Sequence, residues 1–256
     1  MSDLQATEPR VLAVVPARFA STRFPGKIIT PLLGKPLVIH AYERAKQATL
    51  VTDVVIATDD RRVIDAVAPY GAHCILTRDD HATGTDRIAE VARGRSETLI
   101  VNVQGDEALI DPRTIDATIR PLLEHPELMM STARHRISAE EALDPNRVKV
   151  VCDEAGRALL FSRAPIPHVR DAVDREMAPA CYWQHVGLYA YRRDFLLAYA
   201  AMPQTPLEKL EKLEQLRVLE RGYSIAVVDT AYEGIGVDVP EDLIRVEKLL
   251  ALEGDR

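Results

Sequence analysis

The chain has 256 residues, of which 47% are hydrophobic and 28% are charged. These fractions are typical of a globular protein and exclude a low-complexity chain, and the length is sufficient to bury a sizeable core. The formal net charge of −7 argues against a general binder of nucleic acid or anionic membranes, because such proteins normally carry a basic excess. Any site for an anion must therefore be a local basic cluster.

The sequence shows no pattern of export, membrane insertion or a cysteine framework. The first ten residues lack the basic region and apolar stretch of a signal peptide, and no apolar run approaches the roughly 18 residues needed to cross a bilayer. The three cysteines are far apart and form no CxxC pair, so neither disulfides nor a zinc site is indicated. We expect a cytoplasmic protein.

The first half of the chain alternates short apolar segments with segments of helical periodicity. The apolar segments are expected to be strands and comprise 11–15, 53–60, 73–76 and 98–107. The helical segments comprise 37–48, 61–71 and 85–94. This alternation predicts an α/β fold with a mostly parallel sheet and helices on both faces. Ligands of such folds bind beyond the carboxyl ends of the strands, so the loops 16–27, 77–86 and 104–107 are expected to share one edge.

The second half of the chain has a different pattern. Residues 148–163 have the pattern of a β-hairpin, and 184–193 and 224–229 are expected to be strands. Two amphipathic helices are expected, over 206–222 and 240–254. We therefore predict one domain over 1–256 with an insert at about 129–200, which forms either a wall of the substrate site or a dimerisation arm.

The loop PARFASTRFPGK (16–27) is the local basic cluster, and it directly follows the first expected strand. Its two guanidinium groups (Arg18 and Arg23), its ammonium (Lys27) and the backbone N–H groups of a tight turn suit a triphosphate. It is not a Walker A loop, because the glycine and the Ser or Thr of GxxxxGK[ST] are missing, and no GxGxxG follows a strand.

Two aspartates lie where an unpaired carboxylate would be costly without a cation. Asp106 comes at the end of the segment 98–107, close to Gln104, and Asp238 lies in GIGVDVPED (234–242). Carboxylate oxygens are suitable ligands for Mg²⁺, although an aspartate at the end of a strand often only caps a turn. Both interpretations are open at this point.

The segment TRDDHATGTDR (77–87) contains Arg78, Thr83, Gly84 and Thr85, which can contact a base or a ribose. The same residues fit the capped start of a helix, and the two roles are compatible. The acidic pair at 59–60 lacks the spacing of the DxD metal motif of glycosyltransferases and is expected to cap the helix that follows it.

These motifs, with GKPLVIHAYERA, NRVKVV, FSRAPIP and PLEKLEKLEQLRVLE, occur in order over about residues 11–250. Together they resemble the CMP-Kdo synthetases, the 3-deoxy-manno-octulosonate cytidylyltransferases of lipopolysaccharide synthesis. PARxxSxRxPGK resembles the wider sugar-acid cytidylyltransferase group, whereas VQGDE, HxGLYxYR and LEQLR point to the Kdo branch. The resemblance implies a nucleotide-diphosphosugar-transferase-like fold, a homodimer, and transfer of a cytidylyl group from CTP to the anomeric hydroxyl of Kdo with Mg²⁺ as cofactor.

The resemblance also implies roles for individual residues. The CTP phosphates would contact Arg18, Arg23 and Lys27, and the last of these would also be catalytic. Cytosine and ribose would contact Arg78, Thr83 and Gly84. Catalytic Mg²⁺ would be bound by Asp106 and Asp238. The Kdo pocket would be lined by Gln104, Arg163, His185, Tyr189, Glu214 and Gln215, with the sugar carboxylate paired with Arg163.

The sequence departs from the family pattern at Ala108, at His168 and at Ala82–Thr83, which we expect near the sugar pocket. An 8-amino analogue of Kdo or a related ulosonic acid is therefore an alternative substrate. A non-catalytic nucleotide-sugar sensor and a glycosyltransferase are alternatives of another class. Lys27 and the two aspartates argue against the sensor, and the missing DxD motif argues against the glycosyltransferase.

Overall fold

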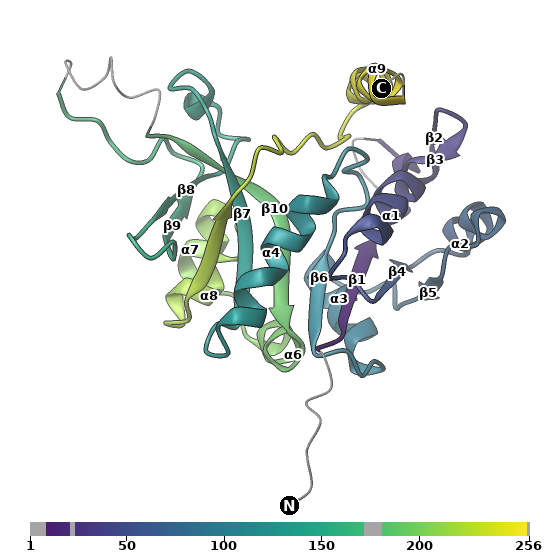
Figure 1. Ribbon diagram of the computed structural model, residues 1–256, viewed down its shortest axis with the longest axis horizontal. Helices are drawn as coiled ribbons and strands as arrows, with labels where there is room; N and C mark the ends of the chain where they lie inside the picture. The colour runs from purple at the N-terminus through teal and green to yellow at the C-terminus, as the bar shows by residue number, and fades with distance from the viewer. Residues whose placement is uncertain (1–8, 21–23, 172–180, 255–256) are drawn as a thin grey trace, which may run out of the picture.

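A nine-stranded sheet forms the centre of the fold among the residues that the computed structural model describes, which are 9–20, 24–171 and 181–254 (Figure 1). Seven of its strands follow the order β11-β7-β10-β6-β1-β4-β5. In chain order these strands are β1 (Val11–Pro16), β4 (Asp53–Thr58), β5 (Cys74–Leu76), β6 (Leu99–Asn102), β7 (Met130–Arg136), β10 (Trp183–Arg192) and β11 (Ile225–Asp229). A separate two-stranded sheet pairs β2 (Pro31–Leu32) with β3 (Lys35–Pro36).

The sheet is parallel from β6 through β1 and β4 to β5, and β11 is parallel to β7. Only β10 is antiparallel to its neighbours β6 and β7 within this seven-strand order of the described residues. The carboxyl ends of β1, β4 and β6 therefore lie side by side and direct their following loops to one edge. The four strands predicted in the first half of the chain and the mostly parallel fold are confirmed.

Helices cover both faces of the sheet, as predicted. On β1, Val11, Ala13 and Val15 pack in a cluster with α1 (Leu37–Gln47), α2 (Arg61–Val67) and α4 (Pro112–Glu124). Leu12 and Val14 point to the opposite face, where they pack in a cluster with α3 (Gly84–Arg93), α6 (Arg193–Ala201) and α8 (Leu216–Glu220). This alternation buries β1 on both faces, which explains its uninterrupted apolar sequence.

The predicted hairpin is present as β8 (Lys149–Cys152) and β9 (Ala158–Ser162), which pair with each other and extend the sheet from β10. The helix α4, the strand β7 and the helix α6 were not predicted from the sequence. Within 129–200, β7 and β10 are central strands of the sheet, and β8 and β9 lie in the part of the chain between them. A role of this part as a dimerisation arm stays a prediction.

The prediction of one helix over 206–222 was wrong. The chain forms α7 (Pro206–Glu211), leaves the helix at Lys212 and forms α8 from Leu216. Lys212 has φ 55° and ψ 45°, a left-handed conformation. Apolar residues keep their helical spacing on both sides of this position, so the sequence pattern does not show the break.

The remaining elements complete the molecule. They are the 3₁₀ helices η1 (Lys27–Ile29), η2 (Ala68–Tyr70) and η3 (Glu141–Leu143) and the C-terminal helix α9 (Pro240–Gly254). The segment 230–239 leads from β11 across the upper end of the sheet in Figure 1 to α9. None of the described helices combines the length and the apolar character needed to cross a lipid bilayer.

The left-handed backbone of Lys212 leads to a stability prediction. A left-handed conformation costs a residue with a side chain about 1 kcal/mol more than it costs glycine. We expect Lys212→Gly to raise the free energy of unfolding by about 1 kcal/mol, measured by urea denaturation. The matched change Lys209→Gly, inside α7, should lower it by about 1 kcal/mol. Changes of the same sign would contradict the prediction.

Candidate active site

A cavity of about 410 Å³ lies at the carboxyl ends of β1 and β6. Segments far apart in the sequence form it, and its lining residues are Pro16, Arg18, Ala20, Lys27, Ile28, Gly84, Gln104, Gly105, Asp106 and Asp238. Residues of all three loops that were expected to share an edge contribute to this lining. We call it the phosphate cavity.

Lys27 lies at the centre of the phosphate cavity. Its Nζ donates hydrogen bonds to Asp106 Oδ2 at 2.6 Å, to Asp238 Oδ1 at 3.1 Å and to the backbone oxygen of Val237 at 2.8 Å. Burial lowers the pKa of Lys27, but the nearby carboxylates of Asp106 and Asp238 outweigh this effect and raise its pKa above the usual value. The ammonium is therefore charged and holds the two carboxylates together.

The two carboxylates form a fitting donor set for a divalent cation. Both face one position, which a cationic group occupies in the structure. Mg²⁺ is commonly bound through one or two carboxylates together with oxygens of substrate phosphates. No cluster of three or more His, Cys, Asp or Glu side chains suited to a metal occurs in 9–20, 24–171 or 181–254. Asp106 and Asp238 are thus the residues that could hold Mg²⁺, with substrate oxygens completing its coordination.

Gly105 allows the turn that positions Asp106. A Cβ atom at this position would lie 2.7 Å from the backbone oxygen of Pro16, a separation that real Cβ atoms do not adopt. The last residue of β1 and the turn after β6 can approach each other this closely only because residue 105 is glycine.

Arg18 connects two of the loops. Its Nη2 donates to the backbone oxygen of His81 at 2.5 Å, and His81 is itself paired with Glu90 of α3. The Arg18 Nε is buried and has no hydrogen-bond acceptor among the described residues. A buried guanidinium N–H without an acceptor is costly, so a bound anion in the phosphate cavity would complete its contacts.

The structure separates the residues proposed for CTP. Arg18, Lys27 and Gly84 line the phosphate cavity, whereas Arg23 lies outside the described residues. Arg78 is exposed, and its Nε donates to Asp80 at 2.9 Å. Thr83 caps α3, where its hydroxyl accepts from the backbone N–H of Asp86 at 3.2 Å. Neither Arg78 nor Thr83 lines either of the cavities described here.

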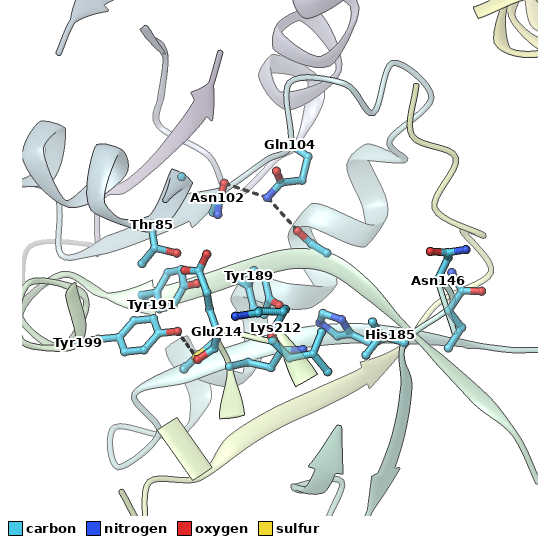
Figure 2. A pocket seen from close by; sticks show the side chains of 17 residues that line it. Thr85, Asn102, Gln104, Asn146, His185, Tyr189, Tyr191, Tyr199, Lys212 and Glu214 are labelled. Carbon is cyan, nitrogen blue, oxygen red and sulfur yellow. Dashed lines mark hydrogen bonds between the residues drawn. The ribbon is translucent and has the colours of Figure 1, made fainter. Parts of the chain in front are cut away.

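A second cavity of about 340 Å³ adjoins the first, and we call it the sugar cavity (Figure 2). The two cavities share Gly84 and Gln104. The Gln104 amide donates to Asn102 Oδ1 at 3.3 Å and to the backbone oxygen of Gly187 at 3.2 Å. These bonds fix Gln104 at the boundary, where it can contact ligands on both sides.

Five of the six residues proposed for the sugar line this cavity, namely Gln104, His185, Tyr189, Glu214 and Gln215. Arg163 is the exception. Its guanidinium donates to the backbone oxygens of Glu211 at 2.8 Å and of Pro145 at 3.0 Å, and it is not among the lining residues. Arg163 therefore holds the loop before β8 against the end of α7.

Burial controls the charge of the sugar cavity. It lowers the pKa of His185 to about 3, and it raises the pKa of Glu214. The Thr132 hydroxyl donates to the backbone oxygen of Leu188 at 2.7 Å, so its 2.9 Å contact with His185 is a bond donated by Nε2. His185 is thus neutral, and its Nδ1 can accept a hydrogen bond.

Sequence reasoning missed several lining residues of the sugar cavity. They are Asn102, Asn146, Tyr191, Tyr199 and Lys212. The alternation of β10 could have revealed Tyr191, because it follows Tyr189 by two residues and points to the same face. No local pattern indicates Lys212, since its role depends on the break between α7 and α8.

The acidic pair after β4 also has two distinct roles. Asp60 caps α2 by accepting from the backbone N–H of Arg62 at 2.9 Å, as predicted for the pair. Asp59 instead accepts from Nη2 of the fully buried Arg87 at 2.8 Å. This second bond ties α3 to the loop after β4.

Comparison with known proteins identifies the family. Residues 12–225 match the protein-family model described as cytidylyltransferase. The 3-deoxy-manno-octulosonate cytidylyltransferase of Solibacter usitatus (strain Ellin6076) is 54% identical over 241 residues, which cover 94% of each chain. The one of Geobacter metallireducens (strain ATCC 53774 / DSM 7210 / GS-15) is 53% identical over 249 residues, 94% of this chain and 98% of the relative. The chain belongs to the 3-deoxy-manno-octulosonate cytidylyltransferase family.

Solved structures agree with this family assignment. The structure of CMP:2-keto-3-deoxy-manno-octonic acid synthetase complexed with CTP matches with a TM-score of 0.91 at 43% identity, over 95% of this chain and 99% of that chain. The 4-diphosphocytidyl-2C-methyl-D-erythritol synthase of Anaerococcus prevotii DSM 20548 matches with a TM-score of 0.63 at 13% identity and shares the fold alone. The family resemblance seen in the sequence motifs is therefore confirmed.

The burial of His185 predicts an acid-dependent loss of stability. Its pKa is about 3 in the folded protein and about 6.5 in an unfolded chain, so protons bind the unfolded state preferentially below pH 6.5. Stability is therefore lost as the pH falls from 6.5 towards 3. Between pH 7.5 and 5, the wild type should lose about 2 kcal/mol more unfolding free energy than His185→Asn does.

Urea denaturation of the ligand-free proteins at both pH values measures this difference. His125→Asn, a change at an exposed histidine after α4, is the control and should lose as much as the wild type. An equal pH-dependent loss in the wild type and in His185→Asn would contradict the prediction.

Proposed function

We propose that the protein transfers a cytidylyl group from CTP to the anomeric hydroxyl of Kdo and releases pyrophosphate, as a step of lipopolysaccharide synthesis. The observation that carries this proposal is the pair of adjoining cavities that share Gly84 and Gln104. One contains a charged Lys27–Asp106–Asp238 cluster, and the other is lined mainly by amides, hydroxyls and aromatic rings. The activity for which the relatives are named supports the same reaction.

In the proposed reaction an oxygen–phosphorus bond forms between the sugar hydroxyl and the α-phosphorus of CTP. The bond to the bridging oxygen breaks on the opposite side, pyrophosphate leaves, and the hydroxyl proton passes to solvent or to the departing pyrophosphate. The protein contributes mainly position and charge, as phosphoryl transfer requires. Arg18 and Lys27 are placed to bind phosphate oxygens, and Gln104 is placed to orient the two substrates at the cavity boundary.

We propose Mg²⁺ as cofactor, held by Asp106 and Asp238. When bound, it would neutralise phosphate charge and lower the pKa of the attacking hydroxyl. Lys27 keeps the two carboxylates directed at one position before the ligands arrive. Two like-charged carboxylates stay close together only with a cation between them. Because the Lys27 ammonium already supplies this cation, the two side chains need less rearrangement when Mg²⁺ and the substrates bind.

The positions of the sequence departures favour Kdo over another ulosonic acid. Ala108 is fully buried and packs with Leu37 and Val237, and His168 is exposed. Neither these residues nor Ala82–Thr83 line the sugar cavity, but Thr83 hydrogen-bonds Glu214 and so lies next to it. None of the departures replaces a lining residue. A homodimer and a cytoplasmic location, where CTP is available, complete the proposal.

Variants of Asp106 and Asp238 test whether the protein is an enzyme or a non-catalytic nucleotide-sugar sensor. We expect Asp106→Asn and Asp238→Asn each to lower turnover at least about a thousandfold, because each weakens charge stabilisation of the transition state. Asp194→Asn, at the exposed start of α6, should keep wild-type turnover. Pyrophosphate release with CTP, Mg²⁺ and Kdo measures all three variants.

The same assay with the 8-amino analogue of Kdo in parallel identifies the sugar. Preference for the analogue would preserve the chemistry and change the substrate. Near-normal activity of both aspartate variants, or no pyrophosphate release by the wild type with either sugar, would overturn the enzymatic proposal.

A further inference from the structure

Lys212 is the only lysine or arginine among the described residues that line the sugar cavity. The one lining histidine, His185, is neutral because burial lowers its pKa to about 3. The other polar lining groups are amides, hydroxyls and the Glu214 carboxyl. The cavity therefore contains many partners for sugar hydroxyl groups and one cation.

The backbone directs Lys212 into this cavity. Its left-handed conformation ends α7 and starts the turn that leads to Glu214 and Gln215. Figure 2 shows its side chain running across the pocket, with the nitrogen on the side of Tyr191 and Glu214.

The Lys212 ammonium has no hydrogen-bond or ion-pair partner among the described residues that line the cavity. The other nearby cations are occupied. Lys149 donates to the backbone oxygens of Asp144 and Arg147, and Arg163 donates to those of Glu211 and Pro145. Both side chains bind backbone carbonyl groups, so neither the Lys149 ammonium nor the Arg163 guanidinium is directed at a ligand.

From this geometry we infer that Lys212 binds the carboxylate of the sugar-acid substrate and so selects an acidic sugar over a neutral one. The inference rests on the proposed function and gives Lys212 the role that the sequence had suggested for Arg163. A sugar acid of this kind carries one group that is ionised at neutral pH, its carboxylate. An ammonium at the wall of the cavity is the matching partner, because hydrogen bonds between two charged groups are stronger than those between neutral groups.

A binding cycle between protein and ligand tests the inference. Calorimetric titration measures the affinity for Kdo and for its methyl ester, which lacks the charge, in the wild type and in Lys212→Met. We expect Lys212→Met to weaken Kdo binding about ten- to a hundredfold and to change ester binding less than about twofold. Lys212→Arg should retain most of the Kdo affinity.

Two further variants separate the charge from the backbone strain. Lys212→Gly relieves the left-handed strain but removes the ammonium, so it should weaken Kdo binding as Lys212→Met does although its fold is stabilised. Lys209→Met, at an exposed position of α7, should bind Kdo as the wild type does. In steady-state kinetics the KM for Kdo should rise in Lys212→Met, and the KM for CTP should not change.

The outcomes distinguish this inference from the proposed function. If the wild type turns over Kdo and Lys212→Met binds it equally well, the inference is wrong and the function stands. Equal losses for Kdo and its ester would also overturn it, because they would indicate a structural role. A wild type that neither binds nor turns over Kdo would overturn the function and the inference together.

Discussion

The ion pairs of Lys27 with Asp106 and Asp238 are the interaction on which the active-site arrangement depends. Without the ammonium, two carboxylates would face each other in a partly buried position, where their repulsion is screened less than in water. Lys27 also binds the backbone oxygen of Val237 and so attaches the segment before α9 to the loop after β1. Positions 27 and 238 are thereby joined although 211 positions separate them in the chain.

This constraint combines with one close approach of backbone segments to bring the two substrate sites together. Gly105 brings the end of β1 against the turn that carries Asp106. Gly84 begins α3 at the boundary of the cavities, where the helix N-terminus favours negative charge. Gln104 is held between them by Asn102 and Gly187. A phosphate group and a sugar hydroxyl can therefore meet at one place without any side chain acting as a nucleophile.

The strand β7 and the helix α4 were not predicted from the sequence, and the reason can be identified for each. β7 lies between β10 and β11, but Ser131 and Thr132 are fully buried in it and satisfied by backbone oxygens, so its sequence lacks the apolar signal of a central strand. The helix α4 contains Pro121, which local rules interpret as a helix end. In both cases tertiary contacts compensate for a locally unfavourable residue.

Apolar periodicity and charge at strand ends are local properties, so residue patterns along the chain are sufficient to predict the parallel half of the sheet, the basic loop after β1 and the acidic residues that face it. Which side chains enter the sugar cavity depends on the folded arrangement. Arg163 and Lys212 have the same charge, and both lie near the end of α7. Backbone oxygens hold the first outside the cavity, and a left-handed turn directs the second into it. The direction of a side chain depends on packing between distant segments, which no local pattern contains.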